Sequence, residues 1–229
     1  MLTTRSPQPQ PAEPQVPLSP APWQLLARGI IVVFRPDARF AAVLPEAQRH
    51  RYRGGVPVLM AVRYLSSDVG PYDELLLVPG KLDFGGDAFY SISHIAVSTV
   101  ASVVNGRRNW AIPKELATLR VEAKGRRLEL RGERDDGFRA AIAAEGCGLP
   151  FPLTTAILPN TLAQERAGRV YVTRLQARGW GLRARLERLE LGGPFFPSLE
   201  WATVALAATV DRVHMSFPVA EVRQTGGAS

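Results

Sequence analysis

Residues 117–133, ATLRVEAKGRRLELRGE, decide the fold class of this chain. Apolar residues alternate with polar ones on both sides of Lys124-Gly125: Leu119, Val121 and Ala123 before the pair, Leu128 and Leu130 after it. A period of two is typical of a half-buried strand, and a glycine between two such runs marks a turn. The stretch therefore predicts a β-hairpin.

Most of the remaining chain also shows strand patterns. Residues 28–35 (RGIIVVFR) form an almost unbroken run rich in β-branched residues, which predicts a strand buried on both faces. Further strands are predicted at residues 56–65, 72–80, 88–99, 138–146 and 169–175. Residues 181–191 (GLRARLERLEL) alternate as well, although their leucines also fit a helical spacing.

Two short helices interrupt these strands. The first is predicted within residues 36–49, where Phe40 and Val43 share one face, and the second at residues 99–110 (TVASVVNGRRNW). Many strands with few helices predict a mainly β (α+β) fold, built as a single β-barrel or a strongly bent sheet.

The two ends differ from this pattern. Residues 1–22 contain seven prolines and no apolar periodicity, which predicts a disordered lead-in. Residues 223–229 end in TGGAS and predict a flexible tail, so that the domain itself spans residues 23–222.

Composition narrows the possible functions. The net charge is +7 and the isoelectric point about 10.2, but the arginines are scattered and no basic cluster is interleaved with aromatics, which argues against nucleic-acid binding. No apolar run approaches the roughly 20 residues that span a bilayer. Cys147 is the one cysteine, and His50, His94 and His214 lack ligand spacing, so neither a metal nor a cofactor is expected. We expect a cytoplasmic protein.

Only three of the 28 basic residues are lysines. Lys124 lies in the predicted hairpin turn and Lys81 follows Pro79-Gly80, so both are expected in solvated loops. Lys114 is different, because it follows an apolar stretch and Pro113. It either extends past its apolar neighbours to the surface or is held in an apolar site.

An apolar site would give Lys114 a specific chemistry. A free lysine has a pKa of about 10.4, so the neutral amine that attacks a ketone is rare at pH 7. Burial or a neighbouring cation lowers that pKa, and a shift of about 4 units costs about 5 kcal/mol. We therefore expect Lys114, if buried, to have a lowered pKa and to act as a nucleophile.

The segment around Lys114, NGRRNWAIPKELA (105–117), resembles the acetoacetate decarboxylase family. That family has Gly-Arg near the end of a short helix, then an apolar stretch, then Pro-Lys-Lys-Leu. Gly106, Arg107, Pro113, Lys114 and Leu116 stand in register with this pattern. PWQLLARGIIVVFRPD, YDELLLVP, LPNTLAQ and VHMSFPVAEV follow in the family's order, so the resemblance covers roughly residues 20–222.

The resemblance implies the roles of particular residues. Lys114 is implied to form a Schiff base with a β-keto acid, a lysine chemistry for which acetoacetate decarboxylase is itself a standard example. Glu74 maps onto the family's active-site glutamate, and Arg28 maps within one residue of its active-site arginine, which could pair with the substrate carboxylate. The family also implies a homo-oligomer.

One position departs from the family pattern. The second lysine of the motif is replaced by Glu115, whose carboxylate would favour a protonated Lys114 if the two side chains met. Three functions therefore stay open: decarboxylation of a β-keto acid, aldol condensation or dehydration through the same iminium, and non-catalytic binding of a small ligand with Lys114 paired to Glu115 or Glu74.

Three further residues are candidates for the walls of a substrate pocket. Trp110 and Phe89 fit either a pocket or the core, and His94 lies on the strand that precedes the second helix.

Overall fold

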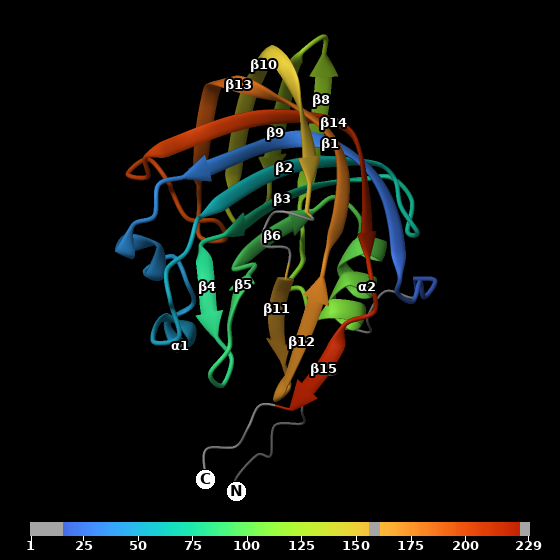
Figure 1. Ribbon diagram of the computed structural model, residues 1–229, viewed down its shortest axis with the longest axis vertical. Coiled ribbons are helices and arrows are strands. Elements are labelled where there is room, and N and C mark those ends of the chain that lie inside the picture. The colour runs from blue at the N-terminus through green and yellow to red at the C-terminus, as the bar shows by residue number, and fades with distance from the viewer. Residues whose placement is uncertain (1–15, 156–160, 225–229) are drawn as a thin grey trace, which may run out of the picture.

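Strands form most of the molecule, as the sequence predicts. The structure is a computed structural model of the 229-residue chain, and it describes residues 16–155 and 161–224. The strands form two sheets within one domain. In Figure 1 the larger sheet arches over the upper part of the molecule, while the smaller sheet and helix α2 lie beneath it. The mainly β, barrel-like fold is thereby confirmed.

The larger sheet has ten strands in the order β7-β6-β3-β2-β1-β14-β13-β10-β9-β8. Its neighbours pair antiparallel except β6 and β7, which are parallel. The bounds are β1 (Trp23–Phe34), β2 (Val58–Ser66), β3 (Tyr72–Val78), β6 (His94–Val97), β7 (Glu115–Leu116), β8 (Thr118–Lys124), β9 (Arg127–Glu133), β10 (Arg139–Thr154), β13 (Gln176–Gly192) and β14 (Val204–Phe217).

The smaller sheet has five strands in the order β15-β12-β11-β5-β4. The bounds are β4 (Gly80–Asp83), β5 (Ala88–Ser91), β11 (Thr161–Arg166), β12 (Arg169–Arg174) and β15 (Glu221–Gln224). The helical segments are a 3₁₀ helix, η1 (Ala38–Ala41), and the α-helices α1 (Glu46–Arg49) and α2 (Val100–Trp110).

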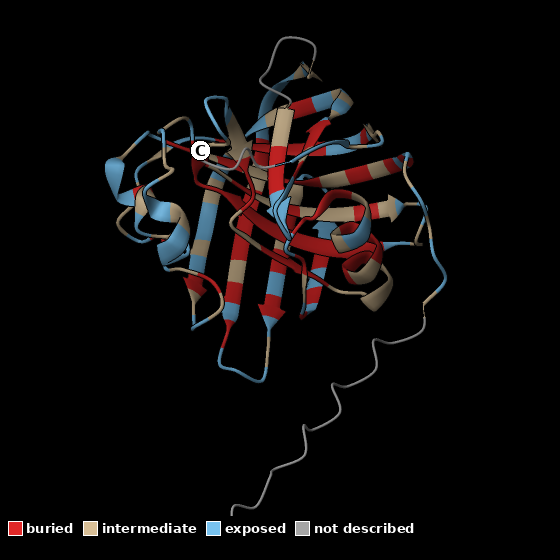
Figure 2. Cartoon of the chain, turned by 90° about the horizontal axis from the view of Figure 1, so that it is seen from below, coloured by how far each residue is buried: buried red, intermediate tan, exposed pale blue. Residues whose placement is uncertain are grey.

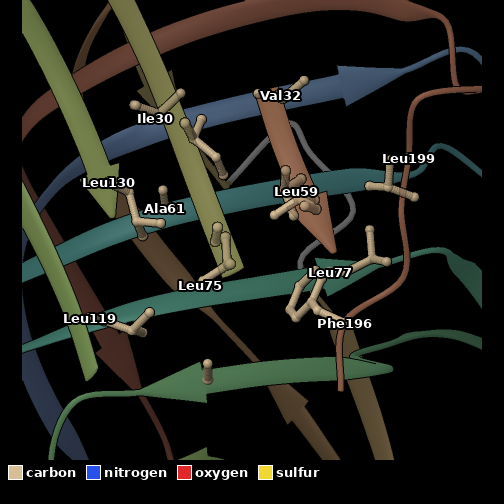
Figure 3. Packing of buried hydrophobic residues seen from close by; sticks show 14 of the residues in the cluster. Ile30, Val32, Leu59, Ala61, Leu75, Leu77, Leu119, Leu130, Phe196 and Leu199 are labelled. Carbon is tan, nitrogen blue, oxygen red and sulfur yellow. The ribbon is translucent and has the colours of Figure 1, made fainter. Parts of the chain in front are cut away.

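The curvature of the larger sheet creates an apolar interior. Strands β1, β2 and β3 contribute Ile30, Leu59 and Leu75, which pack in one buried cluster with Leu119 and Leu130 of the β8–β9 hairpin (Figure 3). The alternation that predicted the hairpin therefore points its apolar face into this interior. The turn is at Gly125, whose φ of 62° suits glycine.

A second apolar layer covers the opposite face of β3. Trp23, Tyr72, Val97 and Trp110 belong to a separate buried cluster, in which residues of the larger sheet meet α2 and the smaller sheet (Figure 2). Because both faces of β3 are covered, all of Tyr72–Val78 is buried. This includes two carboxylates, Asp73 and Glu74, which lie on opposite faces of the strand.

Several boundaries differ from those expected. The strand predicted at 28–35 begins at Trp23, and the one predicted at 88–99 is divided into β5 and β6, which belong to different sheets. The helix predicted within 36–49 is interrupted before Pro45, because proline cannot continue a helical hydrogen-bond pattern. Phe40 is buried as expected.

Strand pairing decides two further expectations. Residues 181–191 are strand, as their alternation predicts, and the helical spacing of their leucines has no counterpart, because β13 pairs with β10 over Arg178–Gly192 and with β14 over Gln176–Arg183. Lys81 lies in strand β4 rather than in a loop, with its Nζ 5.4 Å from the centre of the Tyr90 ring. The C-terminal part of the domain extends to Gln224 in β15, and residues 225–229 of the expected tail lie outside the described residues.

Residues 16–22 are held against α2 rather than disordered. Asn105 on α2 accepts from the Ser19 N–H at 2.8 Å and donates to the Pro17 carbonyl at 3.1 Å. Asn109, one turn later, donates to the Ser19 carbonyl at 2.8 Å. Two side chains on one face of α2 therefore hold this extended segment by hydrogen bonds to the backbone of the segment. Residues 1–15 of the expected lead-in lie outside the described residues.

Neither α-helix, within residues 16–155 and 161–224, has the length and apolar character needed to cross a bilayer.

Replacing Asn105 should weaken the attachment of this segment. Asn105 is fully buried, so Asn105→Ala leaves polar groups of the segment without partners, and we expect the free energy of unfolding to fall by about 1–3 kcal/mol. Asn109→Ala, which removes one bond to the same segment, should cost less. Urea denaturation of both variants measures this; equal stability of Asn105→Ala and the parent chain would contradict it.

Candidate active site

Lys114 is positioned by a short, fixed connection between α2 and β7. The helix ends at Ala111, whose N–H still donates to the Arg107 carbonyl and whose left-handed φ of 55° turns the chain out of the helix. The Lys114 N–H then donates to the carbonyl of Ile112 at 2.8 Å, across Pro113. The side chain turns inward from this connection and is only 5% exposed.

Three oxygen atoms surround the Lys114 amine. Its Nζ lies 2.9 Å from Glu74 Oε2, 2.9 Å from Ser102 Oγ and 3.3 Å from the Tyr72 hydroxyl. An ammonium group has three N–H donors and no acceptor, so each hydrogen has one partner. The amine is therefore both dry and fully hydrogen-bonded.

Gly106 gives the lysine chain its space. A Cβ at this position would lie 2.7 Å from Lys114 Cδ and 2.9 Å from Cε. Since Gly106 lies inside α2 and the helix has ordinary dihedrals there, the glycine serves packing rather than a turn. The missing side chain at Gly106 thus lets the aliphatic part of Lys114 pack against the backbone of α2.

Arg107 fixes the backbone on which Lys114 stands. Its Nε donates to the Lys114 carbonyl at 2.8 Å and its Nη2 to Glu115 Oε1 at 2.6 Å. The Gly-Arg pair therefore has two separate tasks: Gly106 makes room for the side chain and Arg107 holds the main chain.

Glu74 and Tyr72 reach the amine from β3, where they occupy alternate positions on one face. Tyr64 lies opposite Tyr72 on β2, with the two ring centres 4.5 Å apart. Its hydroxyl donates to Glu74 Oε1 at 3.0 Å. Both carboxylate oxygens of Glu74 are therefore engaged, one by Tyr64 and one by Lys114.

The charges of this cluster set its protonation. Burial alone lowers the pKa of Lys114, but the Glu74 carboxylate and the Tyr72 hydroxyl outweigh it, so that this pKa is raised above its ordinary value. The lowered pKa that the sequence predicted for Lys114 is therefore wrong for the resting protein. Burial also raises the pKa of Tyr72 to about 12 and that of Tyr64 well above its usual range, so both remain phenols.

Arg28 lies away from this cluster. It pairs in register with Arg63 on β2, and Arg63 forms an ion pair with Asp73 at 2.7 Å. Cross-strand partners share a face, and Asp73 alternates with Glu74, so Arg28 lies on the face opposite Lys114. Its Nε pairs with Asp211 Oδ1 at 3.1 Å.

The three expected pocket residues make contacts of their own. His94 pairs in register with Leu77 on the barrel-interior face, and its ring centre is 5.5 Å from that of Phe196. Burial there lowers the pKa of His94 to about 4. Trp110 packs in the core, its Nε1 donating to the Pro218 carbonyl, and Phe89 lies on β5 of the smaller sheet.

Three residues of the cluster had no role assigned from the sequence. Tyr72 stood inside the quoted YDELLLVP segment, two positions from Glu74 and so on its face. Ser102 could have been found one turn before Gly106 on the same helix face. Tyr64 carried no signal, because its place depends on the β2–β3 register. Within the described ranges, no three His, Cys, Asp or Glu side chains converge to hold a metal ion.

Comparisons with known proteins identify the family of this chain. A family model described as acetoacetate decarboxylase matches residues 5–176. The chain belongs to the acetoacetate decarboxylase family. No curated protein matches it.

Solved structures resemble the whole fold of this family member. An acetoacetate decarboxylase-like enzyme from Sphingomonas wittichii RW1 has 15% identity and a TM-score of 0.69, covering 91% of this chain and 95% of that one. An acetoacetate decarboxylase from Legionella pneumophila has the same identity and TM-score, covering 99% and 100%. The enduracididine biosynthesis enzyme MppR has 14% identity and a TM-score of 0.58, covering 92% and 90%. At these identities the likeness concerns the fold.

Glu115, which replaces the second lysine of the family motif, contacts Arg107 rather than the amine. Its side chain is 44% exposed and also lies 3.8 Å from Arg134 Nη1. The carboxylate that acts on Lys114 is Glu74, from a strand far away in sequence.

Removing the Glu74 charge should reverse the direction of the Lys114 pKa shift. In Glu74→Gln burial acts without a compensating carboxylate, so we expect this pKa to fall below about 10.4. In the matched variant Glu115→Gln it should stay where it is. Titration of the lysine Nζ signals by ¹⁵N NMR measures both, with Lys81 and Lys124 as internal references. An unchanged Lys114 pKa in Glu74→Gln would contradict this account.

A methyl group at Gly106 should displace the lysine chain. Glycine to alanine inside a helix ordinarily stabilises by up to about 1 kcal/mol. Here the added Cβ meets Lys114 at 2.7 Å, so we expect Gly106→Ala to destabilise the protein by about 1–3 kcal/mol instead. Thermal and urea unfolding report the sign. In a Lys114→Ala background the same glycine substitution should cost little compared with Lys114→Ala alone, and a persisting cost would locate the strain elsewhere.

Proposed function

We propose that the protein is a Schiff-base lyase that decarboxylates acetoacetate or a related β-keto acid at Lys114. The observation that carries the proposal is the buried amine with its three oxygen partners, at the lysine of the family motif. In this proposal Lys114 is the nucleophile and Glu74 is the base. Arg28 has no part in it, because it lies on the other face of the sheet.

Glu74 resolves the conflict between a raised pKa and a nucleophilic lysine. The raised pKa means that Nζ does not lose its proton to bulk water near neutrality. The same proton can move across the 2.9 Å contact to Glu74 Oε2, leaving a neutral amine beside a neutral carboxylic acid. The net charge of the pair does not change, and a dry environment penalises both of the charges that disappear.

The reaction then follows from the chemistry of the iminium. The neutral amine attacks the ketone carbon, and loss of water gives an iminium that draws electrons from the adjacent C–C bond. Breaking that bond releases carbon dioxide and leaves an enamine. The enamine carbon takes a proton from solvent, which Glu74 can pass on, and hydrolysis frees the ketone and the lysine.

Aldol chemistry through the same iminium is a second candidate. Its support is the likeness to MppR, one structure of which is described as complexed with the condensation product of pyruvate and imidazole 4-carboxaldehyde, at a TM-score of 0.56. An enamine that meets an aldehyde instead of a proton forms a C–C bond. The cluster around Lys114 supports the shared iminium, and the two reactions differ in the electrophile that follows.

Non-catalytic binding is the third candidate, and the raised pKa of Lys114 favours it. A lysine that stays protonated in its pair with Glu74 would hold a ligand by charge and hydrogen bonds without attacking it. A Schiff-base enzyme and a non-catalytic binding protein predict opposite results when borohydride is used to trap an imine at Lys114.

Borohydride reduction in the presence of acetoacetate separates these candidates. We expect irreversible modification of Lys114, located by peptide mass mapping, with none at Lys81 or Lys124 in the same molecules. Lys114→Arg keeps the positive charge but forms no imine under these conditions, and should remain unmodified.

The mass of the adduct and the products identify the reaction. A decarboxylase leaves an adduct without the substrate carboxylate and releases carbon dioxide; an aldolase forms a new C–C bond when an aldehyde is added. No adduct across a panel of β-keto acids and pyruvate would reject the Schiff-base proposal and leave binding as the function.

A further inference from the structure

The Ser102 hydroxyl is a buried functional group that the proposed steps above leave without a task. Ser102 is fully buried on α2, and its backbone N–H donates to the N-cap residue Thr99, so it occupies a fixed position in the first helical turn. Its Oγ lies 2.9 Å from Lys114 Nζ. That contact is as short as the one to Glu74, whose role is to take the first proton.

The count of hydrogens on the lysine amine shows which proton transfer still lacks a residue to carry it. Nζ begins with three hydrogens and keeps one in the iminium, while the substrate oxygen leaves as water with two. One of the two departing protons goes to Glu74 and is returned to the leaving hydroxyl. The other leaves Nζ after the N–C bond has formed and must reach the substrate oxygen, which is attached to the same carbon.

Direct transfer of this second proton is unfavourable because nitrogen, carbon and oxygen would have to close a strained ring around it. A hydroxyl beside the nitrogen avoids that strain. It accepts the N–H proton on one side while it donates its own proton to the substrate oxygen on the other, and it ends unchanged. No oxidant, reductant or further reactant is needed.

From this arrangement we infer that Ser102 is a further catalytic residue, which relays a proton from Lys114 Nζ to the substrate oxygen during formation of the carbinolamine. The inference rests on the proposed Schiff-base function and adds a residue to it. It also fixes the orientation of the substrate, whose ketone oxygen must lie on the α2 side of the amine, toward Ser102 Oγ.

Tyr72 is less suited to this relay. Its hydroxyl is 3.3 Å from Nζ, whereas Ser102 Oγ is at 2.9 Å. Its ring lies against the amine, with Nζ 4.9 Å from the ring centre, so that it also serves as an apolar and π-facing wall. Tyr72 therefore completes the hydrogen bonding of the resting ammonium, and Ser102 moves the proton.

A purely structural role for Ser102 makes the opposite prediction. If its oxygen only stabilised the ammonium, Ser102→Ala would remove one acceptor from the charged form and thereby favour the neutral amine. Iminium formation would then stay the same or become faster. A relay predicts slower iminium formation, so the sign of the change distinguishes the two roles.

The test is the rate at which Lys114 gains mass with acetoacetate at saturating cyanoborohydride, where iminium formation limits the rate. We expect Ser102→Ala to slow this rate about 100-fold, a typical effect of losing a general acid–base group. Ser102→Thr keeps the hydroxyl and should recover the rate to within about tenfold of the parent protein. Ser91→Ala removes another buried serine hydroxyl, one bonded to Gln164, and should not change the rate.

Each outcome has one meaning. A Ser102→Ala rate equal to or above that of the parent protein overturns the relay, as does a Ser102→Thr variant that unfolds normally but is as slow as Ser102→Ala. If the parent protein itself gains no mass at Lys114, the Schiff-base function fails and the relay with it. Slow modification of Ser102→Ala beside normal modification of Ser91→Ala supports the relay.

Discussion

The buried ion pair between Lys114 Nζ and Glu74 Oε2 is the interaction on which the arrangement of this site depends. Two charges removed from water are costly unless they meet in good geometry and their remaining hydrogen-bonding groups are satisfied. Here Ser102 and Tyr72 satisfy the other hydrogens of the ammonium, and Tyr64 satisfies the second oxygen of the carboxylate. Removing either partner would leave an uncompensated charge in the core, so the pair holds the α2–β7 connection in a defined position against β3.

The fold supplies this dry setting by covering one sheet on both faces. The barrel interior buries one face of β3, while α2 and the smaller sheet bury the other. If the face of β3 that carries Glu74 were open to solvent, water would hydrate the carboxylate and separate it from the lysine. The segment 16–22 contributes at a distance, since it is hydrogen-bonded to α2, the helix that carries Ser102 and Gly106.

The sequence predicted the parts of this structure that depend on local patterns. The hairpin around Gly125, the helix before Pro113 and the mainly β fold follow from alternation, helix signals and the family motif. Lys114 and Glu74 were identified from the resemblance, and the structure brings them together.

Local patterns could not predict contacts that depend on the register between strands distant in sequence. Tyr64 reaches Glu74 through the β2–β3 pairing, and the same pairing turns Arg28 toward the opposite face. The expected sign of the Lys114 pKa shift was wrong for the same reason, because the sequence pointed to Glu74 as a site residue but did not show that its carboxylate lies 2.9 Å from the amine. A cytoplasmic location and a homo-oligomer stay predictions.

A crystal structure of the protein after reduction with borohydride in the presence of acetoacetate would show directly whether Lys114 forms an imine. We expect electron density continuous from Lys114 Nζ into an isopropyl group, as remains when the carboxylate has departed before reduction, with Glu74 and Ser102 still beside the nitrogen. An unmodified Nζ that is still paired with Glu74, in crystals treated with enough borohydride to reduce any imine formed, would contradict the proposed mechanism.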